Sequence, residues 1–157
     1  MSEQTSSPGE DQVGVEGAWT LPEDDQGPIT VRAAFLGVGS SWHRRHADHP
    51  DRFAAKGFRC SACRWFEVRI FRELSGRERF LIHFTGVSQV PGEVHWSRAE
   101  YVLTASEVIE SLLTRKAPGG VLRQPFLTGP VARALAQASE FDDELYRAYL
   151  DRVGKVG

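Results

Sequence analysis

The chain has 157 residues, of which 41% are hydrophobic and 25% are charged, a composition typical of one globular domain with a modest core. Its longest near-apolar run, residues 33–39, is far shorter than the roughly 20 residues of a transmembrane helix, and the acidic N-terminus lacks the basic and apolar segments of a signal peptide. These features argue against a membrane or exported protein and predict a cytoplasmic one.

The formal net charge of −2 is unevenly distributed along the chain. Residues 1–27 contain seven acidic residues and no lysine or arginine, whereas residues 28–123 contain fifteen basic and nine acidic residues. A segment this acidic and this poor in apolar residues cannot build a core. We therefore expect a disordered leader over 1–27, with Trp19 and Leu21 as docking points, and a single α+β domain over 28–157. The alternative is a leader that competes with an anionic partner for the basic body.

Four strands are predicted from the alternation of apolar side chains. The first is expected to end at the glycines and serines of residues 37–41, and the second places Glu67 and Arg69 on the face opposite its aliphatic residues. Turn signals at residues 75–76 and 91–92 join the last three strands into antiparallel hairpins. The predicted strands are Ile29–Phe35, Arg64–Glu73, Phe80–Phe84 and Val94–Leu103.

Three helices follow the last strand. Thr104 and Glu107 have the spacing of a capping box, residues 128–130 place a proline in the first turn of a second helix, and Asp142 begins a third. We therefore predict an antiparallel four-stranded meander with three helices packed on one face. A zinc-knuckle-like insertion, residues 42–65, is expected between the first and second predicted strands.

This insertion contains both cysteines and three of the five histidines. Cys60 and Cys63 have the two-residue spacing that directs two sulfurs at one ion, and zinc then requires two further ligands. His43, His46 and His49 are spaced by three residues, so neighbouring pairs can share one face of a turn. We predict a zinc site formed by Cys60, Cys63, His46 and His49, with His43 as the alternate ligand.

Other interpretations of the insertion stay open. The cysteines could be reduced and partly buried beside a surface histidine cluster, or form a redox pair, although Cys60 precedes a strand rather than the helix that lowers a thiol pKa. Four protein ligands would close the zinc sphere and make the site structural, whereas an open sphere would suit a hydrolase. His83 and His95 lie on predicted strands, where a lone histidine is more often packed or solvated than catalytic.

Basic and aromatic residues alternate along the insertion and the second predicted strand. Arginine beside aromatic rings suits phosphates and bases, and it equally suits a protein interface. A solvated face around the metal knuckle is the third interpretation. The residues that we expect to contact a partner are Arg44, Arg45, Arg52, Arg59, Arg64, Trp65, Arg69 and Arg72.

The run HADHPDRFAAKGFRCSACRWFEVRIFR from His46 to Arg72, with VPGEV near residue 90 and ARALAQASEFDDEL further on, resembles uncharacterised small proteins of actinobacteria and their bacteriophages. The resemblance covers nearly all of the chain after the leader. It implies an accessory or phage–host role, and it brings no mechanism or functional residues with it.

We predict a zinc-stabilised binding or accessory protein that acts through the Arg/aromatic surface, more as a binding module than as an enzyme. A protein partner is favoured over nucleic acid, a small-molecule substrate is not expected, and no membrane partner is expected. The alternatives are a nucleic-acid-binding protein and a metal-dependent hydrolase or nuclease that uses the histidine cluster. Tyr146 and Tyr149 on the last helix are expected either to form an oligomer surface or to complete the core.

Overall fold

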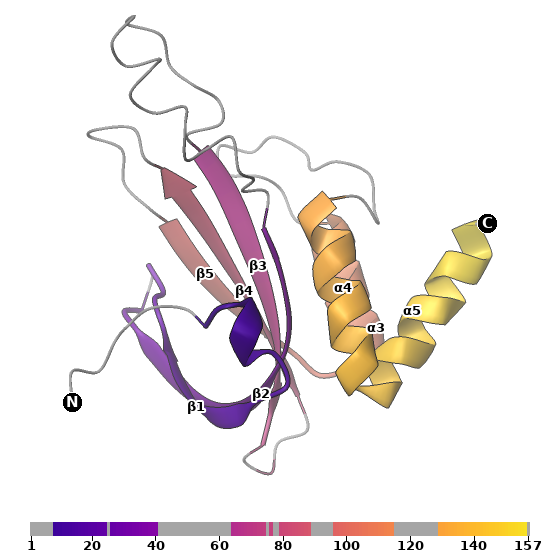
Figure 1. The fold of residues 1–157 in the computed structure, drawn as a ribbon, viewed down its shortest axis with the longest axis horizontal. Helices are drawn as coiled ribbons and strands as arrows, with labels where there is room; N and C mark the ends of the chain where they lie inside the picture. Colours follow the sequence, from indigo (N-terminus) through magenta and orange to yellow (C-terminus); the bar gives the residue numbers. More distant parts are fainter. Residues whose placement is uncertain are drawn as a thin grey trace, which may run out of the picture.

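The computed structural model describes residues 8–24, 26–40, 64–74, 76, 79–88, 96–114 and 129–156. Five strands form one antiparallel sheet in the order β1-β2-β3-β4-β5, and three helices lie on one side of it (Figure 1). The strands are β1 (Glu16–Leu21), β2 (Ile29–Ser40), β3 (Arg64–Glu73), β4 (Phe80–Ser88) and β5 (Trp96–Val102). A 3-10 turn, η1 (Glu10–Gln12), precedes the sheet, and the helices are α3 (Ala105–Thr114), α4 (Gly129–Phe141) and α5 (Asp143–Val156).

The predicted α+β class, antiparallel sheet and three helices are confirmed, but the sheet has five strands rather than four. The additional strand is β1, which lies within the segment that we expected to be a disordered leader. It pairs with β2 along its whole length, from Glu16 opposite Ala34 to Leu21 opposite Ile29. The expectation of disorder is therefore corrected for β1. The predicted zinc-knuckle insertion falls largely on residues 41–63, which lie outside the described residues.

Two apolar side chains attach β1 to the sheet. Leu21 is fully buried, and Trp19 Nε1 donates a hydrogen bond to the carbonyl oxygen of Ala33 at 2.9 Å. The Trp19 ring also packs against Phe35 and Phe71, with ring centroids 5.9 and 6.2 Å apart. Burial of one such side chain contributes about 1.5–3 kcal/mol. The two predicted docking points of the leader therefore dock on the protein's own sheet.

β2 is longer than predicted, because it continues through its glycines to Ser40. A bulge shifts the register with β3 between Phe35 and Gly37. A Cβ atom on Gly37 would lie 2.5 Å from the carbonyl oxygen of Ala134 and 2.8 Å from the amide nitrogen of Ala138. Gly37 therefore allows the backbone of α4 to approach the strand closely, and it does not end the strand as we expected.

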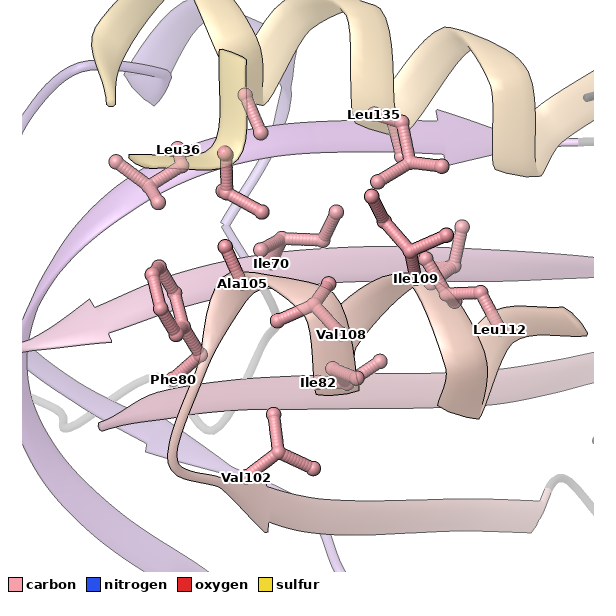
Figure 2. Packing of buried hydrophobic residues seen from close by; sticks show 14 of the residues in the cluster. Leu36, Ile70, Phe80, Ile82, Val102, Ala105, Val108, Ile109, Leu112 and Leu135 are labelled. Carbon is pink, nitrogen blue, oxygen red and sulfur yellow. The ribbon is translucent and has the colours of Figure 1, made fainter. Parts of the chain in front are cut away.

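The main core lies between the three helices and one face of the sheet (Figure 2). The alternation predicted for the second and third strands is confirmed, because Val68, Ile70, Phe80, Ile82 and Phe84 all lie in this core. The helices contribute Ala105, Val108, Ile109, Leu112, Ala134, Leu135, Ala138 and Leu145. The opposite face is consequently occupied by the alternate side chains of the same strands.

Side chains cap α3 and α5 close to where the sequence predicted. Thr104 Oγ1 accepts from the Glu107 amide at 3.1 Å, while Glu107 Oε2 accepts from the Leu103 amide at 3.1 Å, one residue before the position that a capping box requires. Asp142 Oδ1 accepts from the Leu145 amide at 3.0 Å. The bonds to Thr104 and Asp142 each satisfy an amide of the first turn that has no partner within its helix. These caps fix where the helices leave the sheet.

Candidate functional site

Most of the predicted metal and partner-binding residues lie outside the described residues. This applies to the five predicted zinc ligands and to four of the arginines, namely His43, His46, His49, Cys60, Cys63, Arg44, Arg45, Arg52 and Arg59. Within the described ranges, no group of three or more His, Cys, Asp or Glu residues is placed to hold a metal ion. The zinc site therefore stays a prediction.

The remaining predicted partner-binding residues lie on β3, and two of them make internal contacts. Arg69 is only 6% exposed, so it lies inside the protein and not on the surface where we expected it. Arg72 forms ion pairs with Asp142 and, at 3.6 Å, with Glu144, and its guanidinium lies over the Phe80 ring. The alternation of the strand explains these positions, because successive side chains point to opposite faces, each covered by another part of the chain.

The N-terminal segment, residues 8–24, covers the face of the sheet opposite the helices. Asp24 N donates to Ser97 O at 3.0 Å, Asp24 Oδ2 accepts from Ser97 N at 2.9 Å, and Glu23 Oε2 accepts from Ala99 N at 2.7 Å. Ser97 and Ala99 belong to the edge strand β5, whereas β1 pairs at the other edge with the strongly curved β2 (Figure 1). The N-terminal segment therefore joins the two edges of the sheet.

Four polar residues lie beneath this segment on adjacent strands, and we call them the polar cluster: Glu67 and Arg69 of β3, and His83 and Thr85 of β4. In the register of the sheet, Arg69 lies opposite His83, and Glu67 lies opposite Thr85. Residues directly opposite in an antiparallel pair have Cβ atoms only about 4.5–5.5 Å apart. The four side chains therefore share one small region between the sheet and the N-terminal segment.

Arg69 is held by one hydrogen bond and one ion pair. Its Nε donates to the carbonyl oxygen of Pro8 at 2.7 Å. Its Nη1 lies 2.9 Å from Glu67 Oε1, but the two atoms are not aligned for a hydrogen bond, and Nη1 has no hydrogen-bond partner. The ion pair opposes the charge of Arg69, but a buried N–H without a hydrogen-bond acceptor is costly, because it loses the hydration that it has in water.

His83 is fully buried. Its Nε2 lies 2.8 Å from the carbonyl oxygen of Pro22, while Nδ1 has no hydrogen-bond partner. Burial lowers the pKa of the imidazole from its ordinary value of 6.5, and the positive charge of Arg69 acts in the same direction. The Pro22 carbonyl and the carboxylates of Glu23 and Glu67 oppose that shift. His83 is therefore neutral at physiological pH, consistent with the sequence-based expectation of a packed strand histidine.

Thr85 adds a third buried polar atom without a partner, its hydroxyl oxygen. Arg69 Nη1, His83 Nδ1 and Thr85 Oγ1 are the three buried side-chain atoms of the described residues that lack a hydrogen bond. Each such atom costs about 1–3 kcal/mol. Native proteins rarely leave such groups unsatisfied, because protein atoms or ordered water usually supply the missing hydrogen bonds. The arrangement can recognise a polar group that supplies the missing hydrogen bonds.

Sequence reasoning missed this site. Alternation placed Glu67 and Arg69 together on one face of their strand. The same alternation places His83 and Thr85 on the face of the next strand that Phe84 does not occupy. The signal was thus present as polar residues at alternate positions of two adjacent strands. It was not interpretable because nothing in the sequence indicated that the N-terminal segment covers that face.

The two tyrosines of α5 have different environments. Tyr149 is partly buried against the main core, whereas Tyr146 is 49% exposed. Leu150, one turn further along α5, is also 49% exposed. One of the two predicted rings thus completes the core, and the other lies on an exposed apolar stripe of the helix.

Comparison of the chain with protein-family models, curated proteins and solved structures found no match. None of the helices in the described ranges is long and apolar enough to cross a membrane.

Proposed function

We propose that the protein is a binding protein and that the polar cluster is its ligand-recognition site. The observation that carries this proposal is the set of three buried polar atoms without partners, on Arg69, His83 and Thr85. A guanidinium, an imidazole and a hydroxyl are groups that recognise ligands by hydrogen bonds. A ligand that forms hydrogen bonds with all three atoms removes the cost of leaving them unsatisfied.

One end of the cluster is partly exposed. Arg69 and His83 are buried, whereas the Glu67 side chain is 23% exposed and Thr85 is half-buried. Because Glu67 and Thr85 lie opposite each other in the register, the exposed end of the cluster is the Glu67–Thr85 pair. A ligand would reach Arg69 and His83 from this end.

A screen of small uncharged, anionic and cationic fragments by thermal unfolding tests the proposal, because a ligand of the folded state raises the melting temperature by mass action. Thr85→Val removes the hydroxyl of the cluster and preserves side-chain shape. Thr20→Val is the matched control, because Thr20 lies in an exposed cross-strand pair with Thr30. We expect fragments that stabilise the wild type and Thr20→Val but not Thr85→Val. If no fragment distinguishes the two variants, the proposal is wrong.

A second candidate function is binding of a macromolecular partner through an Arg/aromatic surface held in place by zinc. The position of Cys63 favours it, because Cys63 immediately precedes β3, the central strand of the sheet. A zinc ion on Cys60, Cys63, His46 and His49, with His43 as alternate, would be attached to a rigid element. The role would be an accessory one in the cytoplasm, with a protein partner favoured.

Metal analysis of the purified full-length chain tests this second candidate. We expect about one equivalent of zinc, lost in a Cys60→Ser, Cys63→Ser double variant, because structural zinc requires its thiolates. Less than about a tenth of an equivalent in the wild type would contradict the metal site.

Two further assays separate the alternatives within this candidate. A nucleic-acid partner predicts mobility shifts that weaken steeply with salt. A nuclease predicts cleavage that is lost when His43, His46 and His49 are all changed to alanine. A protein partner predicts neither result.

A further inference from the structure

We infer that the polar cluster recognises an uncharged group that both donates and accepts a hydrogen bond, with a carboxamide as the best fit, rather than an oxyanion. This inference rests on the proposed function and specifies the chemical class of the ligand. It follows from the hydrogen-bonding capacity of each free atom and from the charges that surround them.

The tautomer of His83 defines the first requirement. The Pro22 carbonyl oxygen only accepts hydrogen bonds, so His83 Nε2, 2.8 Å away, carries the ring proton and donates it. In the neutral ring, Nδ1 is then the acceptor. Burial of the ring supports the neutral form, since it lowers the histidine pKa. The ligand must therefore offer a donor to Nδ1.

Arg69 defines the opposite requirement. A guanidinium nitrogen only donates, so Arg69 Nη1 requires an acceptor on the ligand. Arg69 and His83 are directly opposite in the β3–β4 register. The Arg69 charge also acts on the His83 ring, so we infer that the required donor and acceptor belong to one small group. Thr85 Oγ1 accommodates either kind of atom, because a hydroxyl both donates and accepts.

The local charges exclude an oxyanion. The positive charge of Arg69 is already opposed by Glu67, whose carboxylate oxygen lies 2.9 Å from Nη1. Glu23 adds a second carboxylate next to the cluster, and both carboxylates act on the His83 pKa. An anion would therefore meet two carboxylates, one guanidinium and a neutral imidazole. An ammonium would supply no acceptor for Arg69.

A carboxamide meets all of these requirements. Its oxygen accepts from Arg69 Nη1, its NH₂ group donates one proton to His83 Nδ1 and the other to Thr85 Oγ1, and it carries no charge. Water has the same donor and acceptor capacity, so the ligand competes with water for the cluster, and the net gain per hydrogen bond is modest. The carboxamide could belong to a small molecule or to an Asn or Gln side chain of a partner.

Acetamide and acetate provide the test, because the two molecules have nearly the same shape and differ in charge and in the presence of a donor. The full-length protein, labelled with ¹⁵N in its histidine rings, is titrated with each compound at pH 8, and the ring nitrogens of His83 are observed by NMR. We expect a saturable shift of the His83 Nδ1 signal with acetamide, with a Kd of about millimolar magnitude for so small a ligand. Acetate is expected to produce no saturable shift.

The variants Thr85→Val and Thr20→Val locate the response. Loss of one hydrogen bond of about 1 kcal/mol should weaken acetamide binding about fivefold in Thr85→Val, with no change in Thr20→Val. Equal binding by all three proteins would place the response elsewhere and overturn the inference. The tripeptides Gly-Gln-Gly and Gly-Glu-Gly are compared in the same way. Binding of Gly-Gln-Gly alone would indicate a partner side chain as the natural source, whereas binding of acetamide but of neither peptide would indicate a small molecule.

The outcomes separate this inference from the proposed function. Binding of acetate in preference to acetamide would overturn the carboxamide class but leave a ligand site in the cluster. If neither compound, nor any fragment of the thermal screen, acts through Thr85, both the class and the proposed function are wrong.

Discussion

Arg69 and His83 lie opposite each other on β3 and β4, and each donates a hydrogen bond to a proline carbonyl of the N-terminal segment, Pro8 for Arg69 and Pro22 for His83. Two buried polar side chains thus attach both ends of that segment to the centre of the sheet. Because Trp19 and Leu21 are packed between these attachment points, the segment is part of the folded domain. The same two side chains carry two of the three free polar atoms.

The first prediction concerns the pH dependence of stability. The pKa of His83 is lowered from 6.5 in the folded state, so the unfolded chain binds a proton at a higher pH than the folded chain does. This group should therefore reduce the free energy of unfolding as the pH falls below about 6.5 and have no effect above it. The loss is at most about 1.4 kcal/mol per pH unit, and the carboxylates of Glu23 and Glu67 limit it.

Urea unfolding between pH 8 and pH 5 measures this effect. His83→Gln keeps a donor for Pro22 and cannot be protonated, so we expect a less stable protein at pH 8 with a shallower loss of stability toward pH 5. An equal slope in the wild type and the variant would assign the pH dependence to other groups.

The second prediction concerns Gly37. In Gly37→Ala, the new methyl group would collide with the backbone of Ala134 and Ala138 on α4, and the strand and the helix would have to separate. We expect a loss of about 1–3 kcal/mol, the usual cost of overpacking a core. Gly17→Ala on β1 is the control, because its nearest neighbour, in the Trp19 ring, would be 3.9 Å away. Thermal unfolding of both variants decides the matter, and equal melting temperatures would contradict the proposed role of Gly37.

Sequence-based prediction succeeds where the structure depends on neighbouring residues. The bounds of β3 were predicted correctly, because the alternation of apolar side chains over these ten residues is a local pattern. Thr104 was predicted as a helix cap, and Asp142 as the start of the last helix, for the same reason, since a helix start depends on residues within one turn. The predicted end of β2 is wrong because Gly37, which was expected to end the strand, instead permits contact with α4, nearly 100 residues further along the chain.

The site was less predictable than the fold. The leader was judged by its composition, yet β1 needs only Trp19 and Leu21 at the correct positions to pair with β2. Arg69 was predicted to contact a partner because it lies in the run of arginine and aromatic residues. Its burial depends on the Pro8 carbonyl, a backbone atom 61 residues away. No local pattern encodes that contact.

The third prediction concerns the closure of the sheet edge by the N-terminal segment. Every second amide of an edge strand points away from its sheet, and Glu23 and Asp24 accept from two such amides of β5, those of Ala99 and Ser97. In Asp24→Ala, we expect faster hydrogen exchange at the Ser97 amide and a loss of about 1–2 kcal/mol. Asp24→Asn keeps an acceptor and should largely retain the protection. Unchanged exchange in Asp24→Ala would show that the carboxylate does not close the edge.

The fourth prediction concerns α5. Tyr146 and Leu150 are four residues apart, so they lie on the same side of the helix, and each is about half exposed. The oligomer surface was predicted with Tyr146 and Tyr149; if Tyr146 and Leu150 form it instead, sedimentation velocity at micromolar concentration should detect self-association. A charge at its centre, in Leu150→Lys, should weaken the association about tenfold or more, because removal of a central apolar contact costs at least about 1.4 kcal/mol.

The control for α5 is Ala136→Lys, which introduces the same charge at an exposed position of α4. Circular dichroism should show that both lysine variants remain folded, because neither position contributes to the core. Loss of association in Leu150→Lys alone assigns the surface to α5, and equal loss in both variants would indicate a general effect of charge. A wild-type chain that is monomeric at micromolar concentration would contradict the oligomer hypothesis and leave Tyr149, which packs on the core, as the only one of the two predicted tyrosines with a defined role.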